Sequence, residues 1–215
     1  MTVILSIARD GVERARTGLE LCIAAGGVAL FPADGLYGLA CDPLNATAIE
    51  RIHRVKGRDE GKPSAVLYFS PLAMRELVED LGQRTRSAVS ALLPGPVSLV
   101  VANPSHRYPL ACRSDPERLG VRLIDGPLEG AMCPIFQTSA NRGGDPASAI
   151  FGDVPRKILA DVDVAIDAGP LTGLPSTVVD LSGFDDGGDW SVLREGGMQI
   201  DDLADQLHSL RPWLS

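Results

Sequence analysis

Short apolar runs, separated by amphipathic stretches of uneven length, constrain the fold of this chain more than any other feature of its sequence. Residues 28–31 and 65–69 are strand-like runs, and each follows a segment with helical spacing of its apolar residues, 12–25 and 46–55. From residue 162 onward the strand-like runs follow one another closely. This pattern lacks the regular period of a doubly wound parallel sheet. It therefore predicts an α/β protein with a mixed sheet and helices packed against it.

Two irregular segments interrupt the predicted elements. Residues 32–38 contain two glycines and are expected to form a loop in which the backbone can approach a ligand closely. Residues 103–119 form a longer polar loop, and loops of this length in a compact domain often have a function. The other predicted elements are strands at 97–102, 120–124, 134–138, 162–167, 176–181 and 190–193, helices at 71–80, 83–93 and 153–160, and a short helix or turn at 126–132.

The length of the chain suits one folded domain. Its 215 residues can bury a core, and no repeat, low-complexity segment or linker divides them. We expect a single domain over residues 1–215, with the motifs described below in about 12–198 and a C-terminal helix at 200–213.

Composition restricts the partners and the compartment of the protein. The formal net charge of -8 disfavours a protein that coats nucleic acid or an anionic membrane, because such binding depends on cations facing phosphate. No apolar run reaches the roughly 18 residues of a membrane span, and the N-terminus lacks the apolar core of a signal peptide. The four cysteines are widely separated and form no CxxC pair, which indicates a reducing compartment, the cytoplasm.

A basic segment stands out in this acidic chain. Residues 56–63, Lys-Gly-Arg-Asp-Glu-Gly-Lys-Pro, place three cations, Lys56, Arg58 and Lys62, close together. The glycines and the proline cannot continue the helix that precedes them. Ammonium and guanidinium groups gathered on an irregular segment suit phosphate or carboxylate, although a solvated surface loop has the same composition.

Polar residues elsewhere offer a second half for an anion site. Residues 138–144, Thr-Ser-Ala-Asn-Arg-Gly-Gly, follow a predicted strand and carry short hydrogen-bonding side chains that suit phosphate or sugar oxygens, or an ordinary turn. Arg122 lies within an otherwise apolar strand, where an unpaired charge would be costly, so it indicates either a ligand contact or a structural ion pair. The three histidines share no metal-ligand spacing and are expected at the surface: His53, His106 and His208.

Seven short motifs occur in a fixed order between residues 31 and 196. They are Phe31-Pro32 with Tyr37-Gly38-Leu39, Lys56-Gly57-Arg58 with Lys62-Pro63, Pro94-Gly95-Pro96, Gly120-Val121-Arg122, Ser139-Ala140-Asn141, Pro175-Ser176-Thr177-Val178-Val179-Asp180 and Leu193-Arg194-Glu195-Gly196. Taken together in this register, they resemble the YrdC/Sua5 family, and in particular its short, single-domain members. Members of that family make threonylcarbamoyl-AMP (L-threonylcarbamoyladenylate) for the t6A modification of tRNA.

This resemblance implies a fold and a reaction. The implied fold is a twisted mixed β-sheet flanked by helices around a positively charged cavity. The implied enzyme is a nucleotidyltransferase that condenses L-threonine, bicarbonate and ATP to threonylcarbamoyl-AMP and pyrophosphate, with Mg2+ held mainly by ATP and water. The product would pass to the threonylcarbamoyl transferase that modifies adenosine 37 of tRNA, with no stable nucleic-acid binding and no membrane association.

Positions that match the family motifs carry the expected site residues. Lys56 and Arg58 are assigned to catalysis, and Arg122 and Ser176 to the threonine carboxylate or the carbamate. Ser176 and Arg194 also have simpler interpretations, as a strand-edge hydroxyl and a turn contact. No protein ligand for a metal ion is implied. The resemblance places five residues at ATP: Arg58, Lys62, Ser139, Asn141 and Arg194.

Two departures from the family pattern concern the amino-acid side of the implied pocket. Ala33-Asp34-Gly35 replaces the family's Thr-x-Thr, and Leu67 stands where some members have a polar residue. The nucleotide side matches, so we expect nucleotide binding to be retained and amino-acid specificity to be open. A family paralogue acting on another amino acid or small-molecule carbamate is a second hypothesis, and a double-stranded-RNA-binding module is a third. The loop 103–119 is expected to cover the cavity with its three arginines, Arg107, Arg113 and Arg118.

Overall fold

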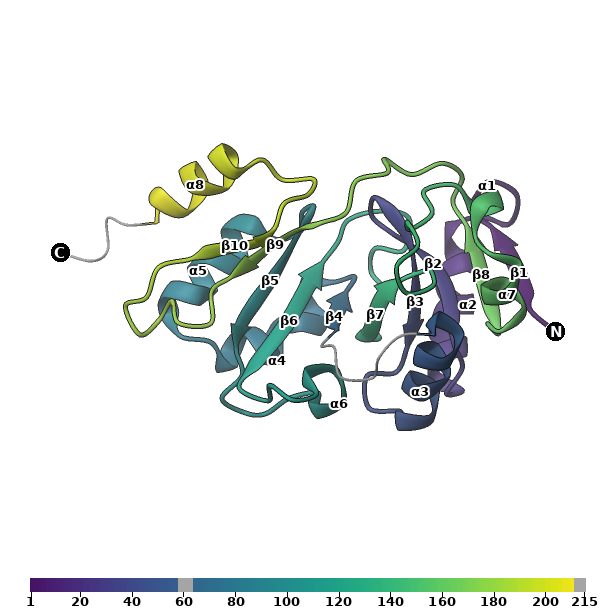
Figure 1. Ribbon diagram of the computed structural model, residues 1–215, viewed down its shortest axis with the longest axis horizontal. Coiled ribbons are helices and arrows are strands. Elements are labelled where there is room, and N and C mark those ends of the chain that lie inside the picture. Colours follow the sequence, from purple (N-terminus) through teal and green to yellow (C-terminus); the bar gives the residue numbers. More distant parts are fainter. Residues whose placement is uncertain (58–63, 211–215) are drawn as a thin grey trace.

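One mixed sheet organises the residues that the computed structural model describes, 1–57 and 64–210 (Figure 1). From one edge to the other its strands are β1 (Val3–Ser6), β8 (Val164–Asp167), β2 (Ala29–Ala33), β3 (Leu36–Cys41), β7 (Ile135–Ser139), β4 (Ala65–Tyr68), β6 (Arg118–Leu123), β5 (Val97–Ala102), β9 (Thr177–Asp180) and β10 (Ser191–Arg194). The pairs β1–β8, β2–β8, β4–β6 and β5–β9 are parallel, and the other neighbours are antiparallel. The predicted α/β class with a mixed sheet is confirmed.

Helices lie along the whole length of the sheet. They are α1 (Ile7–Asp10), α2 (Val12–Ala24), α3 (Ala46–Lys56), α4 (Pro71–Asp80), α5 (Gln83–Leu92), α6 (Pro109–Cys112), the 3-10 turn η1 (Phe151–Asp153), α7 (Arg156–Ala160) and α8 (Ile200–His208). Figure 1 shows α2, α3 and α7 near the N-terminal end of the molecule, and α5 and α8 near the opposite end. Over the described ranges, none of the helices combines the length and apolar character needed to cross a membrane.

Local sequence signals determine where two of the helices begin and end. The side chain of Asn45 caps α3 by accepting a hydrogen bond from the backbone N–H of Ala48 at 3.0 Å, as its residue type predicts. The same helix ends at Gly57, whose φ of 56° lies in the left-handed region that glycine tolerates. Ser70 caps α4 by accepting from Leu72 N at 3.2 Å.

Alternate residues of the strands serve two separate cores. On one face of the sheet, Leu30, Val66 and Phe136 belong to the larger core, which includes buried residues of α3, α4 and α5. On the other face, Phe31 and Leu67 pack in a smaller core with α2. We call this second side of the sheet the α2 face. Since α2 lies mainly against β1, β2 and β8, it does not cover the strands from β6 to β10 on that face.

The structure corrects the loop predicted at residues 32–38. β2 continues to Ala33 and β3 begins at Leu36, so that Asp34 and Gly35 form a two-residue hairpin turn. Asp34 has a φ of 73°, which is the conformation that tight hairpin turns require. Proline and glycine within 32–38 suggested a loop, but the Asp-Gly pair between apolar runs is itself a hairpin signal.

Three smaller expectations also need correction. Residues 3–10 form β1 and α1, which the apolar pattern did not indicate, and the helix predicted at 153–160 is divided into η1 and α7. His53 was expected at the surface and is 2% exposed. Its ring packs edge-to-face against Phe136, with the centroids 5.9 Å apart, because His53 lies on the buried side of α3.

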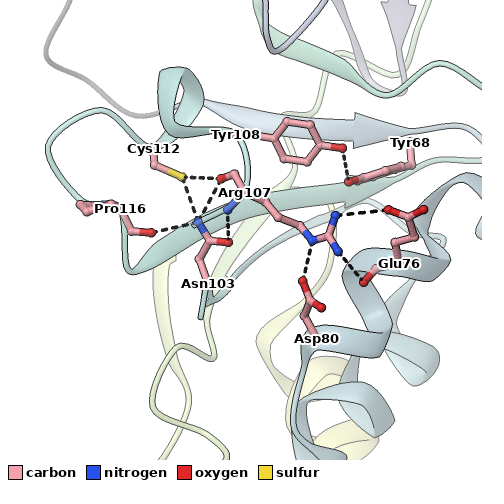
Figure 2. A network of polar contacts seen from close by, with 8 residues as sticks. All are labelled: Tyr68, Glu76, Asp80, Asn103, Arg107, Tyr108, Cys112 and Pro116. Carbon is pink, nitrogen blue, oxygen red and sulfur yellow. Dashed lines mark hydrogen bonds and ion pairs between the residues drawn. The ribbon is translucent and has the colours of Figure 1, made fainter. Parts of the chain in front are cut away.

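The predicted loop 103–119 contains a polar network that holds it against α4 (Figure 2). Asn103 organises it: its Nδ2 donates to the backbone oxygens of Arg107 at 3.0 Å and Pro116 at 2.9 Å. The Arg107 guanidinium in turn reaches Asp80 at 2.5 Å and Glu76 at 3.4 Å. The pKa of the Asp80 carboxyl is lowered by this hydrogen bond to Arg107. Arg107 is therefore turned toward α4 and does not cover a cavity, so that expectation was wrong.

Candidate active site

A cavity of about 710 Å³ lies on the part of the α2 face that α2 leaves open. Strand β6 forms its floor through every second residue, Arg118, Gly120 and Arg122. The intervening residues, Leu119 and Val121, are fully buried in the larger core, as expected when side chains alternate between the faces of a strand. Its volume falls within the roughly 300–1,000 Å³ typical of small-molecule sites.

Neighbouring strands extend this surface toward the edge of the sheet. Ser98 of β5 is paired with Val178 of β9, and Val178 is paired with Arg194 of β10. All three line the cavity, so the sheet register itself aligns them in one row. Ser98 was not predicted, because a single serine inside an apolar strand carries no signal until its partners are known.

Arg122 is the most buried charged group of the cavity, with 5% of its surface exposed. Its Nη1 donates to the carbonyl of Ala33 at 3.4 Å, and its Nη2 lies 3.5 Å from the Asp34 carboxylate. Within the described residues its Nε has no hydrogen-bond partner. Burial lowers the pKa of Arg122 to about 10; Asp34 opposes this shift and Arg194 adds to it. The guanidinium is therefore still charged at neutral pH, with long contacts and one donor unpaired, which is the arrangement that an anionic ligand would complete.

Arg194 and Ser176 form a second polar cluster of the same cavity. Nη2 of Arg194 donates to the Ser176 carbonyl at 2.7 Å and to its hydroxyl at 3.1 Å. The Ser176 hydroxyl also lies 2.7 Å from that of Ser98. A Cβ on Gly196 would come within 2.3 Å of the Pro175 carbonyl, so the chain after Arg194 can approach this close only as glycine. The Leu-Arg-Glu-Gly motif therefore places the Arg194 guanidinium against Ser176.

Lys56 holds the polar loop after β7. Its ammonium group donates to the backbone oxygens of Ser139 and of Asn141 (3.0 Å), and to the Asn141 side-chain oxygen at 3.1 Å. The backbone N–H of Gly143 returns a hydrogen bond to the Lys56 carbonyl at 2.8 Å. Lys56 is 2% exposed and Ser139, but not Lys56, lines the cavity. Lys56 thus ties the end of α3 to the loop that presents Ser139.

The predicted site residues are partly brought together. Ser139, Arg122, Ser176 and Arg194 line one cavity, whereas Asn141 supports Ser139 by hydrogen bonding to its hydroxyl. Arg58 and Lys62, two of the three cations in the basic segment, lie outside the described residues.

Arg118 belongs to the cavity for a different reason from the one expected. It lies in β6, and it forms ion pairs with Asp180 and, at 3.4 Å, with Asp115. Arg113 of the same predicted loop is not among the described lining residues. Of the three arginines expected to cover the cavity, Arg118 alone is among the described lining residues, and it lies in the floor rather than over the opening.

The hairpin turn at Asp34 and Gly35 is packed tightly against residues 172–174. A Cβ on Gly35 would lie 1.9 Å from the Leu174 carbonyl oxygen, and Gly173 N donates to the Gly35 carbonyl at 2.9 Å. The glycine that replaces the family's threonine therefore opens no space, because another part of the chain fills it. The second departure, Leu67, is fully buried in the smaller core and is not at the cavity.

The fold and this cavity define an α/β protein with a cation-lined cavity that suits an anionic small molecule. Among the described lining residues there are three arginines, one carboxylate and several small hydroxyl side chains on a mixed sheet. The family model for Sua5/YciO/YrdC, which carries the description "Telomere recombination", matches residues 22–196. The chain belongs to this family.

Relatives and solved structures agree with that assignment. A threonylcarbamoyl-AMP synthase of Thiobacillus denitrificans is 31% identical over 175 residues, covering 79% of this chain and 93% of the relative. The structure of P. abyssi Sua5 complexed with L-threonine is 22% identical, with a TM-score of 0.81 over 96% of this chain and 60% of that one. E. coli YciO has a TM-score of 0.77 at 20% identity, covering 94% and 98%. The two structures establish a shared fold.

Proposed function

We propose that this protein is a threonylcarbamoyl-AMP synthase, a nucleotidyltransferase that condenses L-threonine, bicarbonate and ATP to threonylcarbamoyl-AMP and pyrophosphate. One observation carries the proposal: Arg122, Arg194, Ser176 and Ser139, each matched to a family motif, converge on a single cavity. Curated relatives of this name at about 31% identity support it.

The reaction requires positioning and charge neutralisation more than covalent catalysis. The threonine amine combines with carbon dioxide from bicarbonate to form an N-carboxylate, the carbamate, and water is released. A carbamate oxygen then bonds to the α-phosphorus of ATP while the bond to pyrophosphate breaks. Both partners are anionic, so fixed cations that hold them in line lower the barrier.

The cavity offers separate groups for the two anions. Arg122, whose Nε has no hydrogen-bond partner among the described residues, suits the threonine carboxylate or the carbamate. Arg194, held by Ser176, and the hydroxyl of Ser139 suit oxygens of the nucleotide. Lys56 acts as a positioning residue through Ser139. The family motif adds Arg58 and Lys62 at the ATP phosphates and Asn141 at the nucleotide.

Mg2+ is expected to enter with ATP and to offset phosphate charge. Asp115 is the one carboxylate among the described lining residues, and it is paired with Arg118. This donor set fits an ion carried by phosphate and water rather than one held in a protein cage. We further propose that the product passes to the threonylcarbamoyl transferase in the cytoplasm.

Two other functions are less well supported. A module for double-stranded RNA would need an extended cationic surface, whereas the chain has a net charge of -8 and Arg107 and Arg118 are paired with carboxylates. A paralogue acting on another amino acid is favoured by the absence of both hydroxyls at Ala33 and Gly35. The paralogue would share the nucleotide half of the cavity.

The direct test is pyrophosphate release from ATP, with threonine and bicarbonate added singly and together, and mass-spectrometric detection of the adenylate. We expect release above the blank when all three substrates are present, and a loss of at least tenfold in the Arg194→Ala variant. Pyrophosphate release that does not depend on bicarbonate and the amino acid, or no release despite ATP binding, would contradict the proposal.

A further inference from the structure

Among its described lining residues, the cavity has one wall without a free polar side chain. We call it the apolar wall; it joins the β2–β3 hairpin to the segment that precedes β9. Its one polar side chain is Tyr37, whose hydroxyl donates to the Gly169 carbonyl at 2.7 Å and accepts from Ala168 N at 3.0 Å. The wall consists of Ala33, Leu36, Tyr37, Gly173, Leu174 and Pro175.

A second side of the cavity has a different chemistry, while Val100, Pro146, Ala147, Val178 and Leu193 line other parts of it. This second side is polar and is formed by the start of β4, the loop before β6, the first residue of β6 and the end of β7; it comprises Ser64, Asp115, Arg118, Gln137, Thr138 and Ser139. A ligand with a polar nucleotide half and an amino-acid half therefore finds two matching environments in the same cavity.

Arg122 connects the apolar wall to the anion site. Its Nη1 donates to the carbonyl of Ala33, a residue of the wall, at 3.4 Å. An amino acid whose carboxylate or carbamate contacts this guanidinium consequently has its side chain next to the wall. The side chain of Leu174, which lines the cavity, is available there because the residue is 56% exposed.

The wall is held in place from several directions. Leu171 N donates to Ala149 O at 2.8 Å, and Gly173 N donates to Gly35 O at 2.9 Å. At the other end, Gly197 N donates to Pro175 O at 2.8 Å. Figure 1 shows this segment passing the β2–β3 hairpin on its way from β8 to β9. Leu174 is thus part of a fixed surface and able to select by shape.

We propose that the apolar wall receives the side chain of the amino-acid substrate, and that the protein accepts valine as well as threonine. The inference rests on the proposed function. The chemistry is unchanged for valine: its amine and bicarbonate give the carbamate and water, and a carbamate oxygen displaces pyrophosphate from ATP to give valylcarbamoyl-AMP. Only the substituent that faces Ala33 and Leu174 differs, a methyl group in place of a hydroxyl.

The size of the preference for threonine over valine distinguishes an apolar wall from one that hydrogen-bonds the threonine hydroxyl. A site that hydrogen-bonds a substrate hydroxyl rejects the analogue without it by roughly 10⁴- to 10⁵-fold, since its own polar groups are left unpaired. An apolar site separates a hydroxyl from an isosteric methyl group by only about 100-fold. We therefore expect kcat/KM for valine to lie within about 100-fold of the value for threonine, and alanine to fall about tenfold below valine because it covers less of the wall.

The experiment measures pyrophosphate release by the full-length protein with ATP, bicarbonate and threonine, valine or alanine. The Leu174→Asn variant places hydrogen-bonding groups in the wall, so we expect the threonine-to-valine ratio of kcat/KM to rise at least tenfold. The matched control is Leu193→Asn, which makes the same change in a cavity leucine of similar exposure, 55%, on β10 outside the wall. This control is expected to keep the ratio of the unmodified protein.

The outcomes separate the inference from the function on which it rests. Turnover with threonine and a preference over valine above 10⁴-fold would overturn the inference and leave the synthase assignment intact. If the threonine-to-valine ratio changed equally in the two asparagine variants, Leu174 would not be a determinant of specificity. Absence of turnover with all three amino acids would contradict the proposed function itself.

Discussion

Replacement of Gly35 by alanine is the sharpest test of how the cavity is built. The added Cβ would stand 1.9 Å from the Leu174 carbonyl oxygen and 2.8 Å from the Thr172 hydroxyl oxygen. Contacts of a Cβ below 3.0 Å are essentially absent from proteins, so the first separation must grow by at least about 1 Å. The atom in the way is backbone, so a rotamer change cannot relieve the contact. The segment that carries Leu174 has to move.

Two quantities follow from that displacement. Overpacking of this kind costs about 1–3 kcal/mol of unfolding free energy, which should appear as a lower urea midpoint with an unchanged slope. A shift of about 1 Å in a wall that positions substrate can reduce turnover by about 100-fold. We therefore expect Gly35→Ala to remain folded and to lose about two orders of magnitude in kcat/KM for the amino acid.

Gly152→Ala is the matched control for this measurement. Gly152 is also outside the positive-φ region, and a Cβ there would meet nothing within 4 Å. The control should match the unmodified protein in both urea unfolding and pyrophosphate release. If Gly35→Ala behaved like Gly152→Ala, the tight contact between the hairpin turn and residues 172–174 would be refuted, and with it the fixed apolar wall.

Three further predictions concern the cations. Arg122→Gln should lower kcat/KM for the amino acid by about 100-fold, equivalent to about 2.7 kcal/mol. Arg122→Lys should not restore this value, because lysine lacks the forked donor of the guanidinium. Steady-state kinetics in which only the KM for ATP changed would contradict this prediction. Lys56→Met should raise the KM for ATP, and its effect should be non-additive with Ser139→Ala in a double-mutant cycle, whereas independent, additive effects would exclude action through that loop. Arg107→Ala should lower the urea midpoint at pH 7 without changing KM. Arg107 depresses the pKa of Asp80 in the folded protein, so the stabilisation is present above the pKa that the carboxyl has in the unfolded chain and disappears as the pH falls through its pKa in the folded protein. A difference in urea midpoint that persisted at low pH would refute the pairing.

The sequence predicts this fold better than it predicts its turns. Uneven alternation of apolar runs is a property of many residues together, so single exceptions do not obscure the mixed α/β sheet. A hairpin turn depends on two residues, and the signal of Asp34-Gly35 was masked by the proline and glycine that flank it. Pro32 lies within β2, paired with Tyr37, which propensity alone argues against.

The residues of the site, like the elements of the fold, could be predicted only in part from the sequence. Arg122, Ser176 and Arg194 could be predicted because motif matches name individual residues, and the structure brings them to one cavity. Ser98 reaches the cavity through its pairing with Val178 on a strand distant in sequence, and such pairing is not encoded near Ser98 itself. The burial of Lys56 depends likewise on where the loop after β7 lies.

The alternation along β6 has a consequence for how such a cavity can change during evolution. Arg118, Gly120 and Arg122 face the ligand space, while Leu119 and Val121 between them complete a hydrophobic core. Insertion or deletion of one residue in this strand would exchange the two sets, burying guanidinium groups and exposing leucine and valine. New specificities can therefore arise in β6 only by replacement at every second position, whereas the segment around Leu174, which belongs to no strand, can vary in length as well as in sequence.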